Sequence, residues 1–505
     1  MDTVPAEPPI IVTPANGRVI CPPEARRFVL ISAILASSMG FIDGSVVALA
    51  MPAIRADLGA SLVDAQWISN AYLLPLAALV LIGGAAGDVF GVRTIFAAGI
   101  AIFMATSLAC ALAGDADTLI ATRAAQGIGA ALMVPGSLAI IAKSYPAATR
   151  GRAIGQWAAF SSMTTALGPF VGGMALSFGD VWMWRLIFAI NVPIGLVALA
   201  MLWLRVPGDR PSVRRRLDVP GAVLATMGLG LAAWGLTEYG LPTAERVADP
   251  TLLVALGAVA MIAFILWERQ AKSPMIKLEL FRSKAFSGAN VYTLILFFAL
   301  SAVLFFLPMT LVSAWGKPEW QASLALLPLS LAIATLSGVA GRWADRIGPR
   351  LPLTLGAILM AISYAGLGAT MHAMQLWSLT LPLLVLQALG MALLVSPLSA
   401  AVMLAAPDED TGLASGVNNA VARTAGLLAV AGLGALAGIV FGINSDGRLP
   451  GIEFGAAPST DLDAAEETLR IAASNHAFAT VAFVSAVMCA SSAVVAWLTQ
   501  PSSRG

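Results

Sequence analysis

Residues 84–93 read GAAGDVFGVR, and residues 341–350 read GRWADRIGPR. Both stretches follow the pattern G-x-x-x-D-x-x-G-x-R, and each lies in a short polar gap between two long apolar stretches. A charged turn between membrane spans is costly, so its recurrence at matching places in the two halves of the chain is not expected by chance. The repeat therefore predicts two related halves that are built to move against each other.

The composition assigns the chain to the membrane proteins. Hydrophobic residues make up 58% of the 505 residues and charged residues only 11%, whereas soluble domains usually carry about 25% charged residues. Apolar stretches long enough to cross a hydrocarbon core of about 30 Å as helices recur along the chain, and they lack the alternation of barrel strands. We expect an all-α polytopic protein of about fourteen spans, at residues 28–51, 67–87, 94–114, 118–143, 152–178, 186–204, 218–240, 251–267, 286–313, 321–341, 351–371, 378–404, 415–441 and 477–498.

The distribution of positive charge predicts the orientation. With both termini in the cytoplasm, most of the 29 Lys and Arg residues fall in cytoplasmic loops, including the cluster at residues 214–216. Cytoplasmic loops of membrane proteins carry such an excess, so we expect a multi-pass protein of the plasma (inner) membrane with both termini inside. The Pro-rich start lacks the order of a cleaved signal peptide and is expected to be a disordered tail.

The spans predict a division into two similar bundles. We expect a cytoplasmic tail at 1–27, a six-helix bundle at 28–204, a linker with two extra spans (218–240 and 251–267) at 205–285, a second six-helix bundle at 286–498 and a short tail at 499–505. Each bundle then carries one copy of the repeated turn at the same internal position. For the long outer segment 442–476 we favour a solvated loop, with a short helix from Asp461 to Ser474, capped by Ser459 or Thr460, as the alternative.

Four further motifs carry a resemblance to a known family. They are RAAQGIG at 123–129, GPFVGG at 168–173, FIDGS at 41–45 and WRLIFAINVPIG at 184–195. Together with the repeated turns they resemble the major facilitator superfamily, and in particular its fourteen-span drug:proton antiporters. The resemblance implies two six-helix bundles plus two additional helices, and export of drugs, dyes and quaternary ammonium compounds. The first turn departs from the family pattern, with Val89 and Val92 where basic residues are usual.

An acid and a base inside the predicted spans are the candidates for coupling. Asp43 falls midway along the first span, where burial disfavours the ionised carboxylate and makes proton uptake feasible. Arg123 in the fourth span keeps its charge and is expected to tune Asp43, with Gln126 beside it. The alternatives are a structural carboxyl for Asp43 and, for Arg123, an ordinary anchor whose side chain extends to the outer interface.

The glycine-containing motifs are candidates for conformational control. In the repeated turns the glycines permit close helix approach, and the carboxylates can contact helix N-termini or arginines. We expect these turns to control gating, through Gly84, Asp88, Gly91, Arg93, Gly341, Asp345, Arg346, Gly348 and Arg350. In the fifth span Pro169 predicts a bend, and Gly168, Gly172 and Gly173 predict a face where another helix packs closely and seals the contact between the bundles.

The sequence supports a transporter and offers little for catalysis. Two His residues without metal spacing, no phosphate-binding glycine loop and no paired intramembrane carboxylates argue against an enzyme, a metal site or a cofactor. Without an ATP-binding element, uphill transport must use an ion gradient, so the proton is the expected coupling ion. Membrane lipids are expected partners and nucleic acid is not, and the chain is expected to function as a monomer.

The function that we predict is proton-coupled export of lipophilic drugs by alternating access. Besides Asp43, only Glu238 offers another acid near a span, so neutral or monocationic substrates are favoured over dications. The candidate cavity residues are Phe41, Trp157, Phe160, Asn418, Asn419 and Arg423. The alternative for the three aromatic residues is ordinary packing or lipid contact, and the alternative for Arg423 is an anchor on the cytoplasmic side. The alternatives are a dedicated exporter of one metabolite, antibiotic or lipid, a nutrient importer, and a membrane sensor or scaffold that does not transport.

Overall fold

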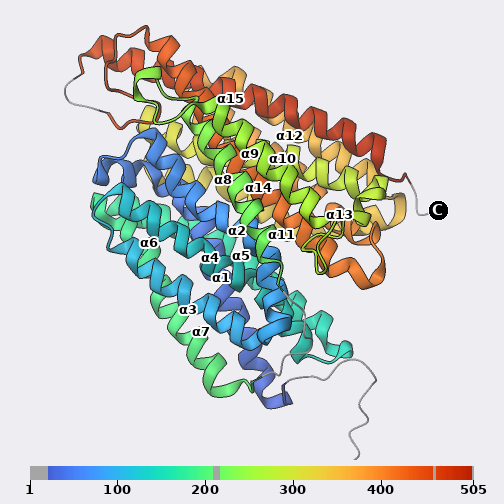
Figure 1. The fold of residues 1–505 in the computed structure, drawn as a ribbon. Helices are drawn as coiled ribbons and strands as arrows, with labels where there is room; N and C mark the ends of the chain where they lie inside the picture. Colours follow the sequence, from blue (N-terminus) through green and yellow to red (C-terminus); the bar gives the residue numbers. More distant parts are fainter. Residues whose placement is uncertain (1–20, 209–216, 459–461, 503–505) are drawn as a thin grey trace, which may run out of the picture.

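The computed structural model describes residues 21–208, 217–458 and 462–502, and within these ranges the chain is helical with connecting turns and no strands. Fifteen α-helices follow one another in the described residues (Figure 1). They are α1 Pro23–Leu58, α2 Leu62–Phe90, α3 Val92–Ala111, α4 Ala116–Ser144, α5 Ala147–Phe178, α6 Trp184–Ala189, α7 Asn191–Arg205, α8 Val219–Glu238, α9 Pro250–Glu268, α10 Lys284–Met309, α11 Glu319–Ile347, α12 Arg350–Thr370, α13 Leu381–Leu404, α14 Thr411–Ser445 and α15 Ala464–Thr499.

Most of these helices are long and apolar enough to cross a membrane. Thirteen helical segments of the described chain meet both requirements, with α6 and α7 forming one segment at Val181–Arg205. The remaining long helix, α5, contains a shorter apolar stretch at Leu167–Phe178, and its 32 residues give it a length of about 48 Å. The chain is therefore a multi-pass membrane protein, and the count of fourteen spans remains a prediction that fits this arrangement.

The helices form two bundles with the same internal packing. In the first bundle α2 packs on α4, α3 on α4 and α7, and α1 on α5 and α7. In the second, α11 packs on α13, α12 on α13 and α15, and α10 on α14 and α15. The bundles meet through two crossed pairs, α2 with α14 and α5 with α11. The extra helices α8 and α9 pack on each other, and α8 also contacts α2 and α14 (Figure 1).

The two repeated turns have the same local geometry. Gly91 has φ 96° and its counterpart Gly348 has φ 84°, a conformation that other residues rarely adopt. A Cβ at Gly84 would lie 3.8 Å from Pro135 of α4, and one at Gly341 would lie 2.5 Å from Ser396 of α13. Gly91 and Gly348 thus allow a tight turn in both bundles, and Gly341 also allows a close helix contact in the second. We call the end of the bundle that carries these turns the turn end, and the end that carries residues 446–463 the loop end.

Several predicted boundaries are wrong in the structure. The solvated loop predicted for residues 442–476 is much shorter, because α14 continues to Ser445 and α15 begins at Ala464. The side chain of Asp463 accepts hydrogen bonds from the amides of Ala465 and Glu466, so Asp463 caps this helix; residues 459–461, with the two predicted caps, lie outside the described residues. The first helix begins at Pro23, inside the predicted tail, and the predicted span 186–204 is divided between α6 and α7.

Candidate functional site

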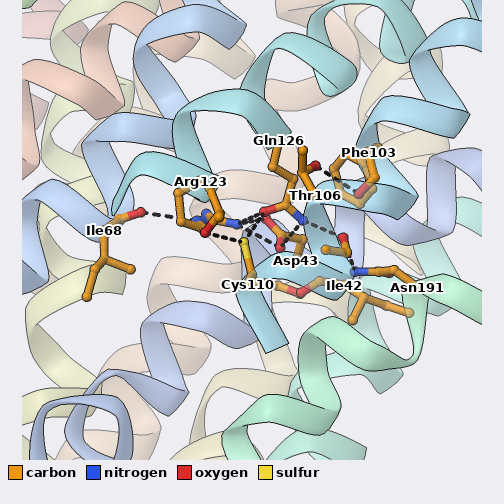
Figure 2. A network of polar contacts seen from close by, with 12 residues as sticks. Ile42, Asp43, Ile68, Phe103, Thr106, Cys110, Arg123, Gln126 and Asn191 are labelled. Carbon is orange, nitrogen blue, oxygen red and sulfur yellow. Dashed lines mark hydrogen bonds and ion pairs between the residues drawn. The ribbon is translucent and has the colours of Figure 1, made fainter. Parts of the chain in front are cut away.

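A buried ion pair lies in the centre of the first bundle. Asp43 of α1 has no exposed surface, and Arg123 of α4 is only 2% exposed. Arg123 Nη1 donates to both carboxylate oxygens of Asp43, at 2.8 Å to Oδ1 and 2.6 Å to Oδ2 (Figure 2). The alternative in which Arg123 extends to the outer interface is therefore wrong, because its charge is neutralised inside the protein.

Gln126 connects this ion pair to a wider polar network. Its Oε1 accepts a 2.7 Å hydrogen bond from Arg123, while its Nε2 donates to Asp43 Oδ1 at 3.2 Å and to Ser107 Oγ at 2.7 Å (Figure 2). Asn191 Nδ2 also donates to Ser107 Oγ, at 3.3 Å. The network joins α1, α3, α4 and α7. A hydrogen-bonded network in a buried environment stabilises one arrangement of the helices that it joins.

Aromatic side chains and a backbone carbonyl complete the environment of Arg123. Its guanidinium lies 4.3 Å from the ring centroid of Tyr72 and 5.6 Å from that of Phe188, distances at which a cation is attracted to the ring. Arg123 Nε donates to the carbonyl of Ile68 in α2 at 3.1 Å (Figure 2). One side chain thus links the acid on α1 to the backbone of α2.

Glycines determine how closely the helices around this site approach. A Cβ at Gly127 would lie 2.4 Å from the carbonyl oxygen of Tyr72, and one at Gly129 would lie 2.6 Å from the amide nitrogen of Phe103. Both separations are shorter than real Cβ contacts allow. The RAAQGIG motif therefore combines two functions: Arg123 and Gln126 reach Asp43, and the glycines bring α2 and α3 against α4.

The Gly-Pro segment of α5 contacts the second bundle at the loop end. A Cβ at Gly173 would lie 2.6 Å from Ser323 Oγ and 2.9 Å from the carbonyl oxygen of Glu319, both in α11. Ser177 Oγ donates to Glu319 Oε2 at 3.1 Å. Gly168 and Gly172 instead face Val46 of α1. The predicted close packing is present, and Gly173 is the glycine that contacts the other bundle.

A second contact between the bundles closes the loop end. Arg55 at the end of α1 donates to the carbonyl of Phe454 at 2.8 Å and forms an ion pair with Glu453 at 3.1 Å. The same Glu453 carboxylate accepts a hydrogen bond from the amide of Leu62. The segment between α14 and α15 thus lies against the first bundle, a contact that the sequence did not indicate.

A position in the central helix α1 is not covered by neighbouring side chains. Gly44, next to Asp43 in the central helix α1, is exposed, and a Cβ there would meet nothing within 4 Å. Phe160 of α5 is 49% exposed and Val339 of α11 is 52% exposed, although these two helices contact each other near the loop end. Helices of both bundles contact α1, so the exposed Gly44 borders a space between helices, while the close contact of Gly173 with α11 lies at the loop end.

Charged side chains in the repeated turns lie at the surface of the turn end. Asp88 pairs with Lys143 of α4 at 2.9 Å, and the two side chains are 57% and 32% exposed. Arg93 donates to the carbonyls of Leu202 and Trp203. The guanidinium of Arg350 lies 3.9 Å from the ring centroid of Trp497. The first acid thus has a lysine partner rather than the arginine or helix N-terminus that we expected.

The predicted cavity residues lie in both bundles: Phe41 and Trp157 belong to the first, and Asn418 belongs to the second. Trp157 Nε1 donates to Ser37 Oγ at 2.9 Å, so this ring holds α5 against α1. Phe41 is half-buried. In the second bundle Asn418 Nδ2 donates to Asn290 Oδ1 at 3.2 Å and to Thr293 Oγ1 at 2.7 Å.

Asn419 and Arg423 lie further along the same helix, α14. Asn419 is exposed and Arg423 is half-buried, and Arg423 Nε donates to Asn419 Oδ1 at 3.4 Å. Glu238, the other acid considered near a span, is 4% exposed at the loop end of α8. It accepts hydrogen bonds from Trp234 and from the Val247 amide, so its role in the structure is local.

The sequence analysis missed the residues that support the ion pair. Tyr72 contacts Arg123, Ser107 contacts Gln126, and Asn191 donates to Ser107. In the second bundle Asn290 and Thr293 accept hydrogen bonds from Asn418. Polar residues within apolar spans are a usable signal, because each must find a partner in a medium without water. That signal indicates burial against another helix but not which helix.

Two similarly packed helical bundles, the first with a buried ion pair at its centre, have the architecture of a membrane transporter. Residues 33–431 match the sequence model of the Major Facilitator Superfamily, and the chain belongs to this superfamily.

Relatives and solved structures agree with this assignment. The chain is 33% identical over 411 residues to the tetracenomycin C resistance and export protein of Streptomyces glaucescens, covering 81% of this chain and 75% of the relative. It is 30% identical over 408 residues to the multidrug resistance protein Stp of Mycobacterium tuberculosis, with 81% and 75% covered. A bacterial homologue of the human lysosomal transporter Spinster shares the fold, with a TM-score of 0.68, 17% identity and coverage of 95% of this chain and 97% of that one.

Proposed function

We propose that this protein is a drug exporter that exchanges lipophilic compounds for protons by alternating access. The relatives named for antibiotic export and multidrug resistance support the direction and the class of substrate. The proton as coupling ion is supported by one observation above all: the Asp43 carboxylate is fully buried in the centre of the first bundle and is held by a side chain that cannot lose its own proton.

In this proposal a proton on Asp43 changes the contacts of Arg123. A neutral carboxyl attracts the guanidinium much less than a carboxylate does, so the two bonds from Nη1 weaken. Arg123 remains bonded to the Ile68 carbonyl and stacked near Tyr72, both in α2. Because α2 packs against α14 of the second bundle, the change at Asp43 reaches the contact between the bundles.

The closed loop end corresponds to one state of the transport cycle. With both termini in the cytoplasm, as the positive charges predict, the turn end faces inside and the compound enters from there. The contacts of Gly173 with α11 and of Arg55 with Glu453 must then separate to release it outside. The surface charges of the repeated turns, Asp88 and Asp345, are in place to stabilise the alternative state, in which the turn end closes.

A dedicated exporter of one compound is the second candidate. It is favoured by the relative named for a single antibiotic, tetracenomycin C. The two candidates share the mechanism and differ in the number of compounds that are exchanged for protons.

The experiment is substrate-driven proton movement in sealed proteoliposomes that contain a pH-sensitive dye. The native protein and Asp43→Asn are compared over a panel of neutral, monoanionic, monocationic and dicationic lipophilic compounds. We expect several compounds to cause proton movement with the native protein and none with Asp43→Asn. Response to a single compound would select the dedicated exporter.

The matched control is Asp117→Asn, because Asp117 is an exposed carboxylate at the start of α4 in the same bundle. This variant should behave like the native protein. Proton movement that persists in Asp43→Asn would overturn the assignment of Asp43 while leaving antiport in place. A folded native protein that transports none of the panel would overturn the proposed function itself.

A further inference from the structure

Arg423 is a charged side chain in α14 without a carboxylate partner. Among the described residues it forms no ion pair, and Asn419 Oδ1 accepts its Nε at 3.4 Å. It lies about 18 Å along the helix from Thr411, well inside the apolar part of a membrane span. An intramembrane charge is expensive and faces a partner, water or a ligand by default.

The contacts of neighbouring glycines show which way this part of α14 faces. A Cβ at Gly416 would lie 3.0 Å from Leu81 of α2, and one at Gly426 would lie 3.7 Å from Leu73 of α2 and 3.2 Å from Ser301 of α10. Arg423 is three residues from Gly426 and seven from Gly416, so it lies on the same face of the helix. Arg423 therefore points towards the first bundle and away from lipid.

The exposure pattern shows that other helices leave part of this face uncovered. Gly412, Ser415 and Asn419 are exposed and Arg423 is half-buried, and they follow one another at helical spacing. Beyond Arg423 the helix becomes largely buried, starting at Ala425. Arg423 thus lies at the inner end of an open stripe that begins at the turn end.

The charges at the centre add up to a positive site. With Asp43 ionised, Asp43 and Arg123 cancel, and Arg423 contributes one positive charge. With Asp43 protonated, Arg123 is no longer compensated and the positive charge increases. When Asp43 is ionised, its carboxylate is already paired with Arg123 and is not free to bind a cationic drug. When Asp43 is protonated, it has no negative charge to attract one. The sequence-based preference for neutral or monocationic compounds rested on the scarcity of other acids in the spans; in the structure the one central acid, Asp43, is paired with Arg123.

We propose that the exported compounds are lipophilic anions, such as aromatic carboxylates or phenolates, and that Arg423 is the cation that binds them. The proposal rests on the proposed export function and names its substrate class. The exposed apolar side chains of α5 and α11 suit the body of such a compound, and Asn418 and Asn419 lie on the same helix as the guanidinium. In a cell with a negative interior, the membrane potential itself favours outward movement of an anion.

The test uses three ligands with one apolar body: pyrenebutyrate, its neutral methyl ester and pyrenebutylammonium. Binding to the purified full-length protein in detergent is measured for the native chain, Arg423→Gln, Arg423→Lys and Arg152→Gln. Arg152 is exposed on α5 near the turn end and serves as the matched control. Native protein should bind the carboxylate more tightly than the ester, and the ester more tightly than the amine.

We expect Arg423→Gln to lose about ten-fold or more in affinity for the carboxylate, the size of a hydrogen bond to a charged group, with little change for the ester. Arg423→Lys should retain part of the preference, and Arg152→Gln should retain all of it. Tighter binding of the amine by the native protein, equal binding of all three ligands, or unchanged carboxylate binding in a folded Arg423→Gln would each overturn the proposal.

Ligand-driven proton movement in proteoliposomes tests the proposed export function separately from the substrate class. If the neutral ester drives proton movement through the native protein, and Arg423→Gln does not weaken the response to the carboxylate, the export function stands and the anion preference is overturned. If none of the three compounds moves or drives protons, the export function is overturned together with the substrate class.

Discussion

Replacing Arg123 by leucine tests whether the central ion pair is as dry as the structure indicates. Asp43 is fully buried, and in Arg123→Leu its remaining partner in the network is Gln126 Nε2 at 3.2 Å. Removing one partner of a buried pair usually costs about 3–5 kcal/mol, because the other charge is left uncompensated. That corresponds to a decrease on the order of a hundred- to a few-thousand-fold in the ratio of folded to unfolded protein.

The cost should depend on pH and on the second partner. Asp43 can avoid the penalty by binding a proton, so Arg123→Leu should be less destabilised at low pH than at high pH. The double variant Asp43→Asn/Arg123→Leu removes both charges, and it should be more stable than Arg123→Leu alone by at least about 1 kcal/mol.

The assay is unfolding of the detergent-solubilised protein by increasing denaturing detergent, followed by tryptophan fluorescence at about pH 5 and about pH 8. Arg152→Leu, at an exposed site, should change stability by no more than about 0.5 kcal/mol. A cost below about 1 kcal/mol for Arg123→Leu at both pH values, with additive effects in the double variant, would refute a dry and strongly coupled pair.

Three further predictions follow from individual contacts. Gly127→Ala should lower expression of folded protein, because its Cβ would lie 2.4 Å from a backbone oxygen of α2, whereas Gly155→Ala, with nothing within 4 Å, should be neutral in the same size-exclusion assay. Glu268, the last residue of α9, is buried, and burial raises its pKa to about 7; native stability should therefore fall as the pH rises from about 4.5 to about 7, and that fall should be much smaller in Glu268→Gln. Arg55→Ala removes a contact between the bundles at the loop end, so a cysteine-labelling assay should find the loop end more accessible than in the native protein; equal labelling would argue against a closing role.

The sequence determined much of the architecture. Apolar segments that cross a hydrocarbon core must satisfy their own backbone groups, because no water does so there; segments of about 20 apolar residues without the alternation of barrel strands do this as helices. The repeated turn then predicted two similar bundles, and the identical packing of α2 with α4 and of α11 with α13 bears this out. The glycines at the eighth position of both turns could be assigned to a tight turn, and both have positive φ.

The sequence predicted some of the site and not the rest. A carboxyl and a guanidinium within apolar spans each need a partner, so Asp43 and Arg123 were the natural candidates for one another. The supporting polar residues Ser107 and Asn191, and the contact of Arg55 with residues 453–454, depend on which helices become neighbours. Helical periodicity gives the faces of each helix but not the partner of each face, because many helix arrangements bury the same stripe.

The sequence by itself determined the membrane class, the helices, the duplication and the two charged residues that form the central pair. These features follow from the cost of placing backbone groups and charges in a medium without water, and that cost depends on the local sequence. Only the tertiary structure decided the charge of the site. It paired Asp43 with Arg123 and left Arg423 without a carboxylate on an open face of α14. Net charge at a binding site depends on distances between residues far apart in the chain, and those distances arise only when the helices pack.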